Sequence, residues 1–135
     1  TMGKQSTFGS LEEIIGICKD VSGCMPVVDW AHLNCRSAGG LKGQEDYAKI
    51  FDELKLLKLK HLHTHVTGAE YTEVESGKGN EKHHLTIDAK KPDFEPLVKE
   101  ILRRKIDITL ISESPTLEQD ALVLRRMFEK HGYEF

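Results

Sequence analysis

The chain alternates amphipathic helical segments with short apolar segments, and this alternation is the feature that most limits its possible folds. Leu11, Ile14 and Ile15 recur with helical spacing, and Ser10 with Glu13 forms a capping box ahead of them. We therefore expect a helix over residues 10–21. The same reasoning predicts helices over 44–56, over 92–105 and from 116 onward, the last capped by Thr116 with Gln119. It predicts strands over 25–29, 58–66 and 106–113.

Helices between successive strands require parallel pairing with right-handed crossovers. The sequence therefore predicts one α/β domain over residues 1–135, with three parallel strands and about four helices. Residues 30–43 are expected to form a loop, and residues 68–82 are polar without periodicity. Three parallel strands leave two open sheet edges. We expect further strands elsewhere, or a second copy of the chain, to cover them.

Each predicted strand ends in residues that bind metals or move protons. Asp29 closes the first strand with His32 three residues later, His65 lies near the end of the second, and Glu113 ends the third. Functional side chains collect at the carboxyl ends of parallel strands, so these residues are expected to converge. Taken alone, Asp29 could instead cap the next turn and His32 could be a surface residue.

Two adjacent histidines, His83 and His84, follow the second strand, and at most one of them is expected to be a ligand because neighbouring side chains point in different directions. A ligand set of nitrogen and oxygen atoms without thiolate favours zinc, manganese or iron, in hydrolytic or isomerising chemistry.

Charge and cysteine content narrow the function classes. The formal net charge of −3 argues against a broad basic face for nucleic acid, although metal ions can supply positive charge at a local phosphate site. The three cysteines show no paired spacing, which predicts reduced thiols and a cytoplasmic protein. We expect no membrane-spanning segment and no signal peptide.

Several motifs occur in family order and resemble the archaeal-type members of the endonuclease IV family of apurinic/apyrimidinic endonucleases. They are residues 1–5 (TMGKQ), 29–32 (DWAH), 65–71 (HVTGAEY) and 111–115 (ISESP). The resemblance implies a (β/α) barrel of the TIM, xylose-isomerase-like type. The chain would form the C-terminal part of that barrel, with three of its eight strands, and a family glutamate ligand would precede it.

The resemblance also implies a zinc site, with manganese as the alternative metal. It would be held by Asp29, His32, His65, His84 and Glu113, and Glu113 would also orient the attacking water. The family's Asp-x-His ligand pair is altered. With His84 in the histidine role, Lys82 stands at the aspartate position; with His83 in that role, Glu81 does. Spacing to the following helix favours His84.

The implied reaction is hydrolysis of the phosphodiester 5′ to an abasic site in double-stranded DNA, as a step of base excision repair. The loop residues Asn34, Arg36 and Ser37 would contact DNA phosphates. The expected partners are the N-terminal half of the same barrel or a second copy of the chain, and the chain alone is expected to be inactive. Two rival functions remain: a xylose-isomerase-like sugar isomerase or epimerase, and a non-catalytic half-barrel that self-associates.

Overall fold

The computed structural model describes all 135 residues and has a three-stranded parallel sheet at its centre. Its strand order is β1-β2-β5, with β1 at Val27–Asp29, β2 at Leu62–Val66 and β5 at Ile108–Ser112. This confirms the α/β class and the three predicted parallel strands. The barrel type stays a prediction.

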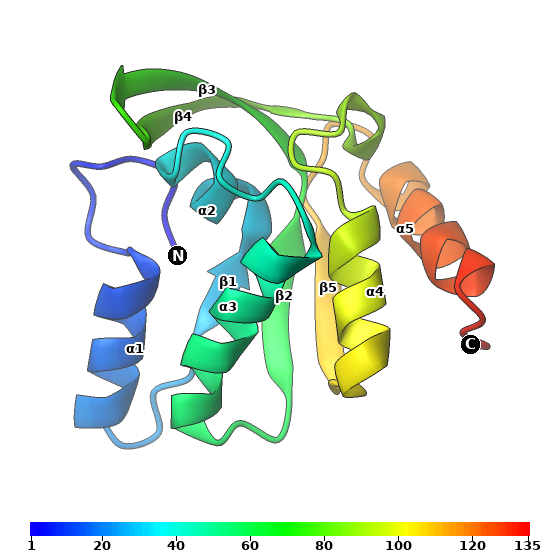
Figure 1. Ribbon diagram of the computed structural model, residues 1–135, viewed down its shortest axis with the longest axis horizontal. Coiled ribbons are helices and arrows are strands. Elements are labelled where there is room, and N and C mark those ends of the chain that lie inside the picture. Colours follow the sequence, from blue (N-terminus) through cyan, green and yellow to red (C-terminus); the bar gives the residue numbers. More distant parts are fainter.

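Four longer helices pack around this sheet. They are α1 (Leu11–Asp20), α3 (Gln44–Leu54), α4 (Glu95–Arg104) and α5 (Glu118–Lys130), and short 3-10 turns follow α3 and precede α4. Figure 1 shows α3 and α4 side by side on one face of the sheet, with α1 near the β1 side and α5 near the β5 side. The predicted helices are thus confirmed, with ends displaced by a few residues.

The hydrophobic core lies between the sheet and its helices. Val28, Leu62 and Val66 point from one face of the sheet into this core, as strand alternation requires. Trp30 is fully buried and packs against Tyr47 and Phe51 of α3. The opposite face carries no helix (Figure 1), and side chains on it remain accessible, with Val27 39% and Ile111 42% exposed.

Two elements differ from the sequence-based expectation. Residues 30–36, expected in a loop, form α2 (Trp30–Arg36), and most of the polar segment 68–82 belongs to an antiparallel hairpin of β3 (Gly68–Glu75) and β4 (Lys78–Leu85). Figure 1 shows the hairpin lying across the end of the molecule where α2 begins. The expectation failed for the hairpin because only three of the sixteen residues in β3 and β4 are buried, and the two strands carry no apolar alternation.

Of the two helix caps predicted from the sequence, one forms and the other does not. Ser10 and Glu13 form the predicted capping box of α1. The cap predicted from Thr116 and Gln119 does not form. The helix α5 begins at Glu118 with Leu117 in the cap position and no side-chain cap, while the Thr116 hydroxyl lies 3.3 Å from the Ser114 hydroxyl.

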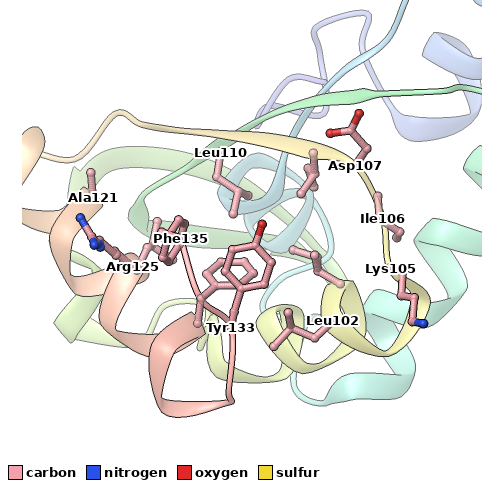
Figure 2. A pocket seen from close by; sticks show the side chains of 13 residues that line it. Leu102, Lys105, Ile106, Asp107, Leu110, Ala121, Arg125, Tyr133 and Phe135 are labelled. Atoms are coloured by element: carbon pink, nitrogen blue, oxygen red, sulfur yellow. The ribbon is translucent and has the colours of Figure 1, made fainter.

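An apolar groove of about 620 Å³ runs along the free side of β5. Figure 2 shows Leu110 of β5, Leu102 of α4, and Tyr133 and Phe135 near the C-terminus converging on it. The groove lies beside an unpaired strand edge, so both the backbone and the apolar side chains of this edge are open to further contacts. Every helix of the chain is too short or too polar to span a lipid bilayer.

Candidate metal centre

Six side chains form two neighbouring groups at the carboxyl ends of the strands. The strand group consists of Asp29, His65 and Glu113, and the hairpin group consists of His32, Glu81 and His84. In each group the potential ligand atoms lie within 4.8 Å of one another. The structure therefore brings together all five residues predicted as ligands and adds Glu81.

Sheet register assembles the strand group. Asp29 pairs with His65 across β1 and β2, and His65 pairs with Ile111 across β2 and β5. Glu113 follows Ile111 by two residues, and its backbone N–H continues the ladder by donating to the carbonyl of Val66. Because side chains alternate along a strand, all three ligand candidates leave the sheet on its uncovered face. The His65 Nδ1 atom lies 3.0 Å from Glu113 Oε1.

Asp29 is the least satisfied member of the strand group. It is 2% exposed and caps α2, because its Oδ1 atom accepts a hydrogen bond from the His32 N–H at 2.9 Å. Its Oδ2 atom is buried without any hydrogen-bond partner. Burial raises the pKa of this carboxyl group, because a charged carboxylate is costly in a site that excludes water. The capping role considered for Asp29 is thus confirmed, yet it accounts for only one of the two oxygens.

The hairpin group owes its geometry to an irregularity in β4. His32 comes from the first turn of α2, whereas Glu81 and His84 are three residues apart on one strand, a spacing that would normally place them on opposite faces. Glu70 pairs with His83 but Tyr71 pairs with Glu81, so Lys82 is an extra residue in a β-bulge. The bulge brings the Glu81 carboxylate and the His84 ring together, with 3.1 Å between Oε1 and Nε2.

Backbone carbonyls set the tautomers of both imidazoles in the hairpin group. The Nδ1 atom of His32 lies 3.1 Å from the carbonyl oxygen of Thr1, and that of His84 lies 2.9 Å from the carbonyl oxygen of Glu113. A carbonyl only accepts, so each Nδ1 must carry a hydrogen. In the neutral ring Nε2 then offers its lone pair, and both Nε2 atoms point at the Glu81 carboxylate, at 3.1 Å each.

These observations fit a divalent cation. Without one, both Nε2 atoms need a proton to satisfy Glu81, and the buried Oδ2 atom of Asp29 accepts no hydrogen bond and has the His32 Nδ1 atom near it, at 3.4 Å. Imidazoles whose second nitrogen donates to a carbonyl are the usual arrangement around zinc, and carboxylate oxygens complete such a set. His32, Glu81 and His84 would hold one ion and Asp29, His65 and Glu113 a second.

The remaining histidines near the site lie outside both groups. His83 is exposed, which favours His84 in the choice that the sequence left open. His61 is exposed and contacts Asp107 and Thr109, and His63 is exposed on the uncovered sheet face. Position along β2 explains the difference, since only His65 is close to the carboxyl end.

The three residues predicted to contact DNA have structural partners. The buried Asn34 side chain accepts from the Leu41 N–H at 3.1 Å, and Ser37 donates to the carbonyl of Leu33 at 2.8 Å. The Arg36 guanidinium donates to carbonyls in residues 4–7. These contacts give all three side chains a role in shaping the loop, and DNA contact by them stays a prediction.

Comparison with known proteins gives a distant relative. An uncharacterized protein of Methanocaldococcus jannaschii is 28% identical over 134 residues, which cover 96% of this chain and 47% of that protein. The chain thus spans about half the length of the curated relative that it matches. No family model matches the chain, and no solved structure does.

Proposed function

We propose that this chain carries the metal centre of a zinc-dependent phosphodiester hydrolase that cleaves DNA 5′ to abasic sites, as the endonuclease IV resemblance implies. The observation that carries the proposal is the pair of adjoining ligand groups, with the buried and unpartnered Asp29 oxygen in one of them. Manganese is the alternative metal, because it accepts the same nitrogen and oxygen donors.

Bound zinc would supply Lewis acidity toward a phosphate oxygen and lower the pKa of water. Glu113 is suited to hold and accept the proton of an attacking water, because its side chain is 37% exposed while its Oε1 atom stays 3.0 Å from His65. The hydrogen bond from His84 to the Glu113 carbonyl fixes the backbone of that residue between the two groups. Asp29 is 2% exposed, which suits it to the role of a ligand better than to moving protons between substrate and solvent.

The charge of the chain accords with a local phosphate site. A formal net charge of −3 gives no broad attraction for DNA, and the three residues expected to meet phosphates are engaged internally. Two divalent cations would more than offset that net charge at the one place where a phosphate must bind. Affinity for the DNA duplex would then depend on metal occupancy.

The rest of the barrel is the proposed partner of this chain, either as further residues of a longer protein or as a second copy. Three features support this: one uncovered face of the sheet, an unpaired β5 edge, and the apolar groove beside that edge. The chain alone is then expected to bind metal but not to incise DNA, because substrate contacts from the other half would be missing.

Two adjoining ligand groups favour the hydrolase over a sugar isomerase or epimerase, in which a single metal would suffice. Two-metal sites stabilise both the attacking and the leaving oxygen of a displacement at phosphorus. A non-catalytic half-barrel predicts self-association without metal. Size-exclusion chromatography of the metal-free chain measures that directly.

The test uses a labelled duplex with one tetrahydrofuran abasic-site analogue, and the same duplex without it as control. We expect a protein containing this chain and the remaining barrel to incise only the first duplex, and to lose this activity on chelation or in Glu113→Gln. His131→Ala, altered far from both groups, serves as the matched variant. Isomerisation of ketoses without incision of DNA would refute the hydrolase proposal in favour of the sugar isomerase. A chain that binds no zinc would refute the metal centre itself.

A further inference from the structure

Residues 1–9 run over the hairpin group and are tied to both elements that build it. The Gln5 side-chain amide donates to the carbonyl of Arg36 at the end of α2 and to the carbonyl of Gly79 in β4, at 2.6 and 3.1 Å. The Gln5 N–H donates to Asn80 of β4 at 2.7 Å. This segment therefore bridges α2, which carries His32, and β4, which carries Glu81 and His84.

Gly3 lies directly against two ligands of the hairpin group. It is buried, and its carbonyl accepts from the Glu81 N–H at 3.0 Å. A Cβ atom at Gly3 would lie 2.7 Å from both Cβ and Oε2 of Glu81, and 3.1 Å from Cδ2 of His32. Carbon atoms do not approach that closely, so a side chain here must displace the carboxylate or the strand that holds it. Gly3 has no positive φ, so the constraint comes from space alone.

We propose that Gly3 and Gln5 are positioning residues that set the distance between His32 and Glu81 and so determine metal affinity at the hairpin group. The inference rests on the proposed metal centre. Gly3 provides the room in which the Glu81 carboxylate turns toward both Nε2 atoms, and Gln5 holds α2 and β4 at the separation that this requires. The strand group touches neither residue and should be unaffected by either.

The experiment compares wild type with Gly3→Ala and with Gly16→Ala. Gly16 lies in α1, where an added Cβ meets nothing within 4 Å, which makes it the matched control. Zinc stoichiometry and affinity are measured by competition with a chromophoric chelator, and Co²⁺ replaces zinc for visible absorption spectra. We expect Gly3→Ala to weaken one of two bound equivalents about 10- to 100-fold, the usual effect of disturbing the surroundings of a ligand, and to change the Co²⁺ spectrum. Gly16→Ala should leave both unchanged.

A wild-type chain that binds no zinc would refute the metal centre and this inference together. A wild type that binds zinc, with the same affinity and Co²⁺ spectrum in Gly3→Ala, would refute this inference alone. If Gly3→Ala does not fold, judged by circular dichroism, Gln5→Glu decides the matter. Gln5→Glu replaces the amide that donates to the carbonyls of Arg36 and Gly79 by a carboxylate of the same size, which cannot donate. It should therefore weaken binding of the same zinc equivalent.

Two cysteines at the other end of β1 carry an independent proposal. The Sγ atoms of Cys18 and Cys24 are 3.8 Å apart. The chain turns after α1, with Gly23 at φ +83° and the Cys24 N–H bonded to the carbonyl of Val21, and this turn lays Cys24 against the last part of the helix. Both side chains are partly exposed, whereas Cys35 is buried.

We infer that Cys18 and Cys24 form a redox-modifiable dithiol site. One thiolate attacks a low-molecular-weight disulfide such as oxidised glutathione and releases one reduced thiol. The second thiolate then attacks the mixed disulfide, forms the Cys18–Cys24 bond and releases the other thiol. The protein dithiol loses two electrons and two protons, and the small disulfide gains them. The sulfur atoms need only a local side-chain adjustment to reach bonding distance, about 2.05 Å.

The test incubates the native chain with oxidised and reduced glutathione, quenches it with acid, alkylates free thiols and measures the mass. Apart from the mass of the alkyl group, we expect a product lighter than the reduced chain by two hydrogen atoms, with Cys35 as its one alkylated cysteine. Cys35→Ser should form the same Cys18–Cys24 disulfide. Cys18→Ser and Cys24→Ser should retain bound glutathione instead. A wild type that keeps glutathione on either sulfur, or keeps both thiols reduced, would refute the pairing.

Discussion

Replacing Asp29 by asparagine separates ligand function from helix capping. The asparagine oxygen can still accept the His32 N–H, so α2 keeps its cap. The second oxygen, which accepts no hydrogen bond and lies 3.4 Å from His32 Nδ1, is replaced by a neutral NH2 group. A buried polar atom without a partner costs about 1–3 kcal/mol, and a neutral amide is cheaper to bury than a carboxylate. The metal-free variant should therefore unfold at the same temperature as metal-free wild type, or a higher one.

Zinc should reverse this order. Losing one of three ligands in the strand group should weaken zinc binding there by at least the ~100-fold that disturbing outer partners of a ligand can cause. At a fixed zinc concentration well above the wild-type Kd, the linked loss of stabilisation is about 2.7 kcal/mol. At about 3 °C per kcal/mol for a domain of this size, the zinc-induced rise in Tm should be about 8 °C smaller in the variant. Zinc in the hairpin group contributes equally to both proteins.

Thermal unfolding followed by circular dichroism, after chelation and after zinc addition, measures both effects. Asp107→Asn is the matched control, because Asp107 is an exposed aspartate at the opposite end of the sheet. Equal zinc-induced shifts in wild type and Asp29→Asn would refute the reasoning. So would a metal-free variant that is markedly less stable than wild type, because the unpartnered oxygen would then have been stabilising.

Three further predictions follow from the same structure. His84→Ala should remove one zinc equivalent by elemental analysis, whereas the exposed neighbour change His83→Ala should remove none; equal losses would contradict the assignment of the hairpin group. Glu113→Gln should abolish abasic-site incision while leaving the circular dichroism spectrum intact, and retained incision would exclude its proton-handling role. Glu100 is buried, and its hydrogen bond with Arg103 lowers its pKa from 4.5 to about 2. The stability that the charged Glu100 adds to the fold is therefore complete above pH 4.5 and is lost as the pH falls toward 2. Glu100→Gln should lower the free energy of unfolding by about 2 kcal/mol at neutral pH and make it less dependent on pH between 4.5 and 2, as measured by urea titration.

The order of helices and parallel strands could be predicted because buried elements repeat apolar residues at the spacing of a helix or a strand. The strands β2 and β5 and the helices α3 and α4 bury apolar side chains at strand or helix spacing, and that spacing is readable without coordinates. The helix α2 escaped prediction because Asp29 is both the last residue of β1 and the cap of α2, leaving no turn between them. The glycines that follow suggested a loop instead.

The hairpin escaped prediction for a different reason. The β3 and β4 strands bury little, and their apolar contact with the rest of the molecule rests on a small cluster of Ala31, Cys35 and Ala69. Small residues carry a weak hydrophobic signal, so tertiary contact with α2 rather than local preference decides the conformation. Nothing in the composition of residues 68–82 indicates that contact.

The candidate ligands on the parallel strands could be predicted from the sequence, whereas the pairing of ligands on the hairpin could not. Asp29, His65 and Glu113 were predictable because parallel register alone brings strand ends together. Glu81 was considered only as a partner of His83, since regular alternation favours residues two apart. The pairing of Glu81 with His84 depends on the extra residue Lys82, which no alternation rule reveals.

The bulge at Lys82 has a consequence for comparing this chain with others. A carboxylate and a histidine separated by one residue on a regular strand leave it on the same side, and so do Glu81 and His84, separated by two residues across the bulge. A carboxylate and a histidine with one residue between them on a regular strand, and the same pair with two residues between them across a bulge, therefore produce the same arrangement of ligand atoms. A chain could pass from one to the other by gaining or losing a single residue, and a search that fixes the gap between these two ligands would treat equivalent proteins as unrelated.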